Sequence, residues 1–163
     1  MDSGNIGFVL LCAAFVFVMT PGLAMFYGGL VRKKNVVNTM MTSIFIIGVG
    51  IVMWVLFGYS LSFAPSGNAF IGDFRWLGLE GVSLTEGYTD DASIPNMVFS
   101  AFQMMFAVIT PALITGAVAG RMKFKSIFVF TIFWSLIVYY PLAHMVWGPV
   151  SYTHLTLPTI CSV

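Results

Sequence analysis

Charged side chains are scarce in this chain of 163 residues, in which Lys, Arg, Asp and Glu together make up 8%. A typical soluble protein carries roughly 25%. Hydrophobic residues reach 59%, so the seven basic and six acidic side chains cannot cover a water-exposed surface of this size. A net charge of +1 provides neither a basic field for nucleic acid nor an acidic tail. The composition therefore predicts a protein whose surface faces lipid.

Patterns of reactive and metal-binding residues are also missing. The two cysteines, Cys12 and Cys161, cannot form a C-x-x-C motif and are too few for a disulfide framework. The sequence contains no H-E-x-x-H or G-x-S-x-G motif, no phosphate-binding loop and no cluster of cysteines and histidines. We therefore expect no enzyme activity, no metal site and no cofactor.

Four uncharged stretches are long enough to cross a membrane, which takes roughly 20 apolar residues for a helix. They cover residues 3–31, 35–72, 92–120 and 126–163. Lipid offers backbone groups no hydrogen-bond partners, and the alternating pattern of membrane strands does not recur, so we expect helices. The predicted fold class is an all-α polytopic membrane protein. Its expected helices cover residues 6–30, 39–63, 94–119 and 126–146.

The distribution of charge along the chain predicts its orientation. Six of the seven basic residues lie in segments 31–38 and 120–125, three in each, whereas all six acids lie near the N-terminus or in segment 64–93. Short loops rich in Lys and Arg stay in the cytoplasm. We therefore expect the N-terminus and segment 64–93 outside the cell and both basic segments inside.

Polar side chains are few within the expected helices, and none is a carboxylate or a permanent cation. They are Thr20, Ser43, Gln103, Thr110, Thr115 and His144. Proton pumps and ion-coupled carriers usually keep ionisable groups at such positions. A single histidine near the outer end of the fourth helix is more typical of a packed or interfacial residue than of a metal ligand.

Three aromatic residues are candidates for a site. Phe102 and Phe106 are four residues apart and so share one helix face. That face could pack against protein or lipid, or it could line a path through the membrane. Trp147, at the outer end of the fourth helix, suits either an interfacial anchor or a bound cation, which indole attracts strongly. The spacing alone leaves these alternatives open.

Four stretches, taken in order, resemble the Amt/Mep/Rh family of ammonium transporters, and in particular its microbial and plant branch. They are MTPGLAMFYGGLVRKKNV at 19–36, GYSL at 58–61, FQMMFA with ITPALITGA at 102–117, and PLAHMVWG at 141–148. The resemblance is co-linear over about residues 5–148. It implies a trimer with one pore in each subunit. Each subunit would have eleven membrane helices in two inverted five-helix repeats, of which this chain supplies the first four.

The resemblance also implies a function. Family members recruit ammonium at an outer vestibule, remove a proton, and pass ammonia through an apolar pore. On the matching motifs, Trp147 corresponds to the cation–π residue of the vestibule, Phe106 to the outer gate, and Phe102 to its neighbour on the same face. The implied partners are ammonium or ammonia, with methylammonium as an analogue, the lipid bilayer, and further copies in a homotrimer. The implied location is the plasma membrane.

The chain departs from the family at two places. Gly120 stands where many members have Glu. Residues 149–163 lack family character and resemble adaptor- or vector-derived read-through, so we expect a family region at 1–148 followed by a non-native tail. The pore histidines of the family would lie beyond residue 148, and His144 is not one of them. We therefore expect the chain to be inactive on its own.

Two other classes of protein compete with this interpretation. A four-helix membrane scaffold or accessory subunit would use the same aromatic residues only for packing. An intramembrane quinone or haem enzyme would need paired histidines or other ionisable groups across the spans, and His144 stands alone there.

Overall fold

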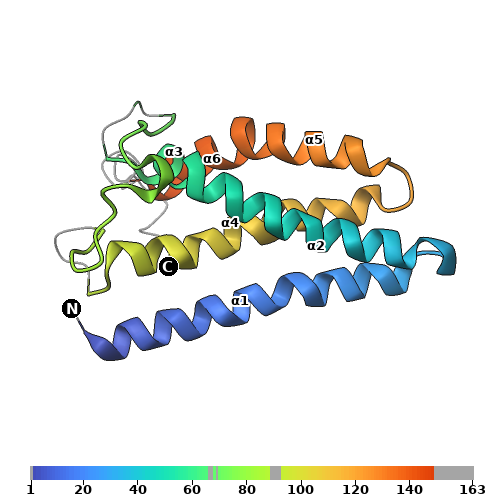
Figure 1. Cartoon of the computed structure of the whole chain (residues 1–163), viewed down its shortest axis with the longest axis horizontal. Helices are drawn as coiled ribbons and strands as arrows, with labels where there is room; N and C mark the ends of the chain where they lie inside the picture. The colour runs from blue at the N-terminus through green and yellow to red at the C-terminus, as the bar shows by residue number, and fades with distance from the viewer. Residues whose placement is uncertain (1, 66–67, 69, 89–92, 149–163) are drawn as a thin grey trace, which may run out of the picture. The chain divides into compact units, whose positions relative to one another are not determined.

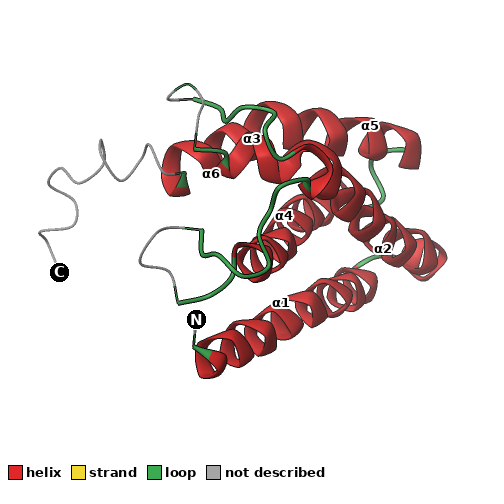
Figure 2. Cartoon of the chain, turned by 60° about the vertical axis from the view of Figure 1, so that its left-hand side comes forward, coloured by secondary structure: helices red, strands yellow, loops and turns green. Residues whose placement is uncertain are grey.

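The regular structure of the chain is helical, as the sequence predicted (Figure 1; Figure 2). The computed structural model describes residues 2–65, 68, 70–88 and 93–148. Its α-helices are α1 (Ser3–Leu30), α2 (Val36–Met53), α3 (Tyr59–Phe63), α4 (Asn96–Val118), α5 (Phe124–Trp134) and α6 (Tyr140–Trp147). Shorter 3-10 or π-helical turns are η1 (Lys33–Asn35), η2 (Trp54–Gly58), η3 (Leu77–Leu79) and η4 (Ser135–Tyr139). The tail predicted at 149–163 lies outside the described residues.

Four helical stretches among the described residues are long and apolar enough to cross a membrane. They are Ser3–Leu30, Lys33–Phe63, Asn96–Val118 and Phe124–Trp147. The second stretch begins at Lys33 rather than at residue 39, because a charged side chain ends an apolar run without ending the backbone hydrogen bonding of a helix. In the second and fourth stretches, a π-helical turn joins two α-helices.

One compact unit comprises Met1–Val52 and Val82–Ile132. Within it, α1 and α4 pack side by side along their length (Figure 1). The backbone N–H of Asp2 donates to the carbonyl of Ser93 at 3.0 Å, just before α4 begins. Near the other end, the hydroxyl of Tyr27 donates to the carbonyl of Leu113 at 3.1 Å. These two contacts show that α1 and α4 run in the same direction.

The helix α2 runs antiparallel to α4 in this unit. The hydroxyls of Ser43 and Thr115 lie 3.2 Å apart, and Gly50 faces Val108. A Cβ atom added at Gly50 would lie 3.1 Å from Cγ2 of Val108, so the missing side chain allows the close approach. Not every glycine serves this purpose, because a Cβ at Gly48 would meet nothing within 4 Å.

Glycines at which an added Cβ atom would clash can be compared with glycines at which it would not, and the comparison gives a prediction about stability. A Cβ at Gly116 would lie 2.6 Å from Cε1 of Tyr27, so Gly116→Ala should push α1 and α4 apart. We expect a loss of about 1–3 kcal/mol in unfolding free energy, the usual cost of overpacking. Thermal unfolding in detergent, followed by circular dichroism, measures it. Gly48→Ala is the matched control, because it makes the same change in helix propensity at a position where the added Cβ atom meets nothing within 4 Å. Equal unfolding temperatures for the two variants would contradict the prediction.

The other unit comprises Met53–Gly81 and Phe133–Val163. Its described core is aromatic, and Trp54, Tyr59, Phe63 and Tyr140 are each at most 1% exposed. The rings of Trp54 and Tyr140 have centroids 6.1 Å apart. Gly58, the last residue of η2, lets Tyr140 approach, since a Cβ there would lie 2.8 Å from Cζ of the tyrosine. This core therefore joins α3 and α6 through ring contacts.

A proline follows the second π-helical turn. Pro141 lies in the first turn of α6, directly after η4. A proline ring clashes with the carbonyl four residues earlier, and that carbonyl belongs to the π-helical turn, where the hydrogen bonds span one residue more. The helical stretch can therefore continue through Pro141 to Trp147.

Candidate functional site

The helix α4 holds the two predicted phenylalanines against each other. The ring centroids of Phe102 and Phe106 lie 5.2 Å apart with an interplanar angle of 76°, which is an edge-to-face contact. Both side chains are half-buried within their unit. One turn further on, the hydroxyl of Thr110 donates to the carbonyl of Phe106 at 2.6 Å. The pair thus forms a fixed apolar surface on one face of a continuous helix.

Trp147, the third predicted site residue, belongs to the other unit and is the last residue of α6. The helix ends there with a hydrogen bond of 2.9 Å from the N–H of Gly148 to the carbonyl of His144. The side chain of Trp147 is 46% exposed, so part of its indole is open to a binding partner.

His144 lies one turn before Trp147 and is 1% exposed. Its Nδ1 atom is 3.0 Å from the carbonyl oxygen of Ser62, and its Nε2 atom is 3.1 Å from that of Asn68. A neutral imidazole has one N–H, so it donates to one of these carbonyls at a time. No group of three or more His, Cys, Asp and Glu side chains suited to a metal occurs among the described residues. These contacts agree with the interpretation of His144 as a packed histidine.

The loop that follows α3 is fastened to that helix by contacts the sequence did not reveal. The hydroxyl of Ser60 donates to the carbonyl of Asp73 at 2.7 Å and accepts from the N–H of Trp76 at 2.9 Å. The rings of Tyr59 and Trp76 are stacked, with centroids 5.4 Å apart and an interplanar angle of 18°. The backbone N–H of Gly72 also donates a hydrogen bond to the carbonyl of Leu61 at 2.8 Å. Together with His144, these bonds hold the loop over the helix that ends at Trp147.

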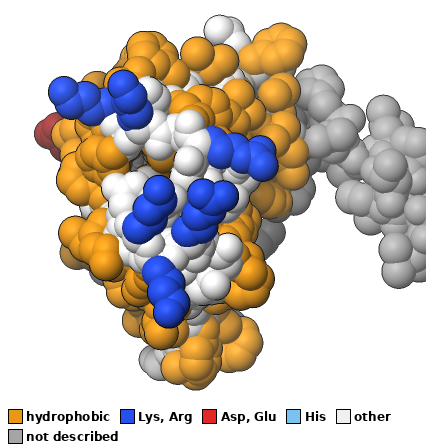
Figure 3. Space-filling view, turned by 90° about the vertical axis from the view of Figure 1, so that its right-hand side faces the viewer, with side chains coloured by type: hydrophobic (Ala, Val, Ile, Leu, Met, Phe, Trp, Pro, Cys, Tyr) orange, Lys and Arg blue, Asp and Glu red, His pale blue; other side chains and the backbone are white. Residues whose placement is uncertain are grey.

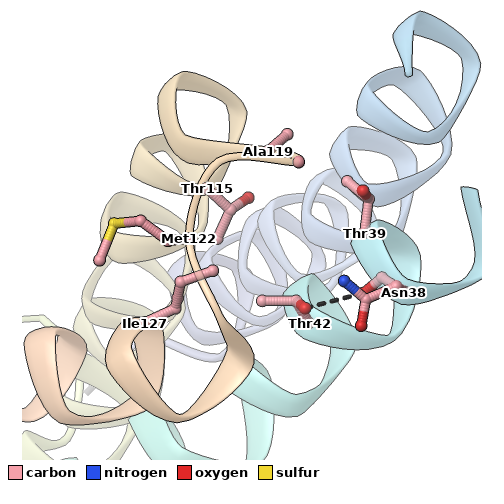
Figure 4. Close-up of a pocket in the computed structure, with 8 residues that line it drawn as sticks. Asn38, Thr39, Thr42, Thr115, Ala119, Met122 and Ile127 are labelled. Carbon is pink, nitrogen blue, oxygen red and sulfur yellow. Dashed lines mark hydrogen bonds between the residues drawn. The ribbon is translucent and has the colours of Figure 1, made fainter. Parts of the chain in front are cut away.

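A small pocket lies in the first unit, beside the basic segments (Figure 4). It is lined by Asn38, Thr39, Thr42, Thr115, Ala119, Gly120, Met122 and Ile127. Its volume of about 10 Å³ has room for one water molecule. The hydroxyl of Thr42 donates to the carbonyl of Asn38 at 2.7 Å, and that of Thr115 donates to the carbonyl of Ala112 at the same distance. These two hydroxyls bond to the backbone of their own helices, and the pocket is a small polar seam between helices.

Gly120, the first departure from the family motifs noted in the sequence, borders this pocket at the end of α4. Its φ angle of 72° lies in the left-handed region that favours glycine after a helix C-terminus. A Cβ there would lie 3.3 Å from Nδ2 of Asn35, which follows the first basic group. This contact places the two basic segments next to each other, and Lys and Arg side chains gather on this end of the unit in the space-filling view (Figure 3).

Comparison with known proteins shows the family. A family model described as Ammonium Transporter Family matches residues 7–157. The chain belongs to the ammonium transporter family. An ammonium transporter of Bacillus subtilis is 49% identical over 148 residues, which are 91% of this chain and 36% of that protein. An ammonium transporter of Mycobacterium tuberculosis is 42% identical over 161 residues, covering 90% of this chain and 34% of its own length.

Solved structures of ammonium transporter relatives agree with the fold. Candida albicans Mep2 superimposes with a TM-score of 0.82 at 28% identity, over 96% of this chain and 34% of that one. Saccharomyces cerevisiae Mep2 gives a TM-score of 0.79 at 35% identity, over 91% of this chain and 35% of that one. The chain thus spans about a third of the length of the ammonium transporters it matches. The resemblance seen in the sequence motifs is confirmed, as is the fold class.

Membership of the ammonium transporter family, together with four apolar helices, identifies a multi-pass membrane protein. The curated relatives are named as transporters, which fits the expectation that this chain is not an enzyme.

Proposed function

We propose that the chain is the part of an ammonium transporter that recruits ammonium and forms the outer section of its path. The observation that carries this proposal is the match to the family over residues 7–157, which includes all three candidate aromatic residues. The proposed partners are ammonium or ammonia, methylammonium as an analogue, surrounding lipid, and further copies of the complete protein in a homotrimer. Each aromatic residue has a distinct proposed part in the path.

Trp147 is the proposed contact for the ammonium cation. An indole face attracts cations more strongly than other aromatic side chains do, and it replaces part of the hydration that ammonium loses on entering. The exposure of this side chain at the end of α6 supports the proposal, because a fully packed ring could not offer its face.

Phe106 is the proposed gate, with Phe102 as its support. An apolar constriction rejects hydrated sodium and potassium ions, because nothing in it replaces their water. The edge-to-face contact between the two rings supports the proposal, since it holds Phe106 at a defined position on α4.

A chimera tests the gate. It joins residues 1–148 to the remaining two thirds of the Bacillus subtilis relative and is assayed by methylammonium uptake in a transport-deficient host. Phe106→Ala removes a half-buried ring, so we expect the maximal rate or the inhibition by potassium to change several-fold. The half-saturating concentration should change by less than about threefold, or ~0.7 kcal/mol at 1.4 kcal/mol per tenfold. Phe133→Ala, which removes a ring that is 58% exposed, is the control and should change neither. A Phe106→Ala chimera with unaltered rate and selectivity would count against the gate.

The proposed location is the plasma membrane, with the N-terminus outside. Two contacts support this orientation within the first unit. The bond between Asp2 and Ser93 joins the N-terminus to the end of the acidic segment. At the opposite end of α1 and α4, Asn35 and Gly120 bring the basic segments together. The charges are thus separated between the two ends, as the positive-inside rule requires.

Cysteine labelling tests the orientation. In a background with Cys12 and Cys161 changed to Ser, we expect Leu84→Cys to react with an impermeant thiol reagent added to intact cells. Leu84 is 71% exposed, so access to it is not limited by packing. Lys123→Cys should react only after the membrane is permeabilised. Labelling of position 123 in intact cells would reverse the proposed orientation.

A further inference from the structure

His144 joins the end of α6 to two earlier segments of its own unit. Its Nδ1 atom lies 3.0 Å from the carbonyl oxygen of Ser62 in α3, and its Nε2 atom lies 3.1 Å from that of Asn68 in the following loop. The histidine is 1% exposed, so bulk water does not compete for these carbonyls. Both polar atoms of one α6 side chain therefore contact backbone from elsewhere in the unit.

Both partners of the imidazole belong to backbone that is itself restrained. Ser62 lies in the last turn of α3, where carbonyl groups have no partner within the helix. Asn68 forms a backbone bridge with Ile71, in which the two N–H to carbonyl distances are 3.0 and 3.3 Å. The ring of His144 thus connects α6 to a helix end and to a closed turn.

The same ring also contacts the turn that carries Trp147. The helix α6 ends with the bond of 2.9 Å from the N–H of Gly148 to the carbonyl of His144, and Trp147 lies within this bonded turn. A Cβ atom added at Gly148 would lie 3.0 Å from Nδ1 of His144, so the imidazole packs directly against this backbone. Because Trp147 is 46% exposed, packing around the indole fixes it only in part, and its position depends on the backbone of the turn.

We propose that His144 is a positioning residue for the recruitment of ammonium. Its ring holds the end of α6 against α3 and the loop, and this places the indole of Trp147 where the cation meets it. The inference rests on the proposed function, which assigns the cation to Trp147. A histidine that only stabilised the fold would change the amount of protein in the membrane. A positioning histidine also changes the apparent affinity that Trp147 provides.

Methylammonium uptake by the chimera tests the inference. His144→Leu offers no N–H to either carbonyl, so we expect the half-saturating concentration to rise several-fold, but no further than in Trp147→Leu. The maximal rate per amount of protein in the membrane should change less.

Two amide variants separate the contacts of the ring. His144→Asn keeps an N–H donor near the position of Nδ1, beside Ser62 and Gly148, and should retain the affinity of the unaltered chimera. His144→Gln keeps a donor near the position of Nε2, beside Asn68, and should raise the half-saturating concentration. Because it retains the bond to the loop, His144→Gln replaces His144→Leu in every comparison if the leucine variant does not reach the membrane.

A double variant shows whether His144 acts through Trp147. In the Trp147→Leu chimera, His144→Leu should raise the half-saturating concentration no further, because the effects of residues that act as a unit do not add. If the two single effects multiply, His144 acts elsewhere and the inference is overturned. Ser60→Ala is the matched control, because it removes the hydroxyl that bonds to Asp73 and Trp76 in the same unit. Equal rises in Ser60→Ala and His144→Leu would overturn the inference as well, because any lost polar contact would then suffice.

The position of residue 147 is measured separately from transport. In the chimera without other cysteines, Trp147→Cys reports the access of an impermeant thiol reagent to the end of α6. His144→Leu should make this labelling several-fold faster, because the end of the helix loses its bonds to α3 and the loop. The labelling rate of Leu84→Cys, at a side chain that is 71% exposed in the first unit, should not change. An unchanged rate at position 147 would overturn the inference.

The two proposals fail in different ways. If Trp147→Leu raises the half-saturating concentration and His144→Leu does not, the positioning role is wrong and recruitment by Trp147 stands. If Trp147→Leu has no effect on uptake, recruitment by Trp147 is wrong. The labelling rate at position 147 then still decides whether His144 positions that residue.

Discussion

Cells that produce residues 1–163 alone should take up methylammonium no faster than cells without the chain, whereas the chimera should restore uptake. The chain spans about a third of the length of its relatives. In each of its four helical stretches, only 11% to 33% of the most apolar window is buried. Most of the helix surface therefore faces lipid or protein that these residues do not supply. A pore needs walls on all sides, and helices that lack these neighbours cannot enclose one.

The comparison depends on equal amounts of protein in the membrane. Immunoblots of membrane fractions, with an epitope at the same terminus of both proteins, provide that control. At equal amounts of the two proteins, we expect uptake by cells with the short chain to stay at background and uptake by cells with the chimera to rise above it. Uptake by the short chain above background, at a rate that saturates with methylammonium, would contradict the prediction. It would show that four helices, alone or as an oligomer, suffice for a path.

The predictable part of the fold follows from local patterns. Charge clusters delimit the four membrane stretches, because an ionised side chain is costly in lipid whatever the fold. Their ends were placed less well. The second stretch starts at Lys33 in a 3-10 turn, since basic side chains at a membrane surface do not prevent helical hydrogen bonding. The π-helical turns before Tyr59 and Tyr140 could not be predicted from hydropathy. Hydropathy reports how apolar a segment is and does not report how many residues each backbone hydrogen bond spans.

The candidate site likewise has some contacts that follow from the sequence and others that do not. Contact between Phe102 and Phe106 follows from their spacing of four residues, which any α-helix converts into neighbouring side chains. The stacking of Tyr59 on Trp76 depends on how a loop folds back over α3. The bonds of His144 to Ser62 and Asn68 likewise join residues far apart in sequence. Such contacts leave no periodic signal, so His144 was predicted as a packed or interfacial residue and its two partners were not predicted.

Trp147→Leu in the chimera should raise the half-saturating concentration for methylammonium. Leucine keeps an apolar side chain at the end of α6 but removes the indole face. Cation–π contacts contribute about 0.5 kcal/mol at exposed sites and about 2 kcal/mol when desolvated. With 1.4 kcal/mol per tenfold, the expected loss of apparent affinity is a few-fold to about thirtyfold. Because Trp147 is 46% exposed in its unit, a value between these limits is expected, with a smaller change in maximal rate.

Two matched variants separate recruitment from packing. Trp147→Phe keeps a weaker π face and should give an intermediate affinity. Trp134→Leu makes the same replacement in the same unit, at a ring whose described contact is Tyr139, with centroids 6.2 Å apart. It should leave the apparent affinity unchanged. If Trp147→Leu and Trp134→Leu behave alike at equal expression, Trp147 is an interfacial anchor. If Phe106→Ala is silent as well, the aromatic residues only pack, and the four-helix scaffold becomes the better account of these helices.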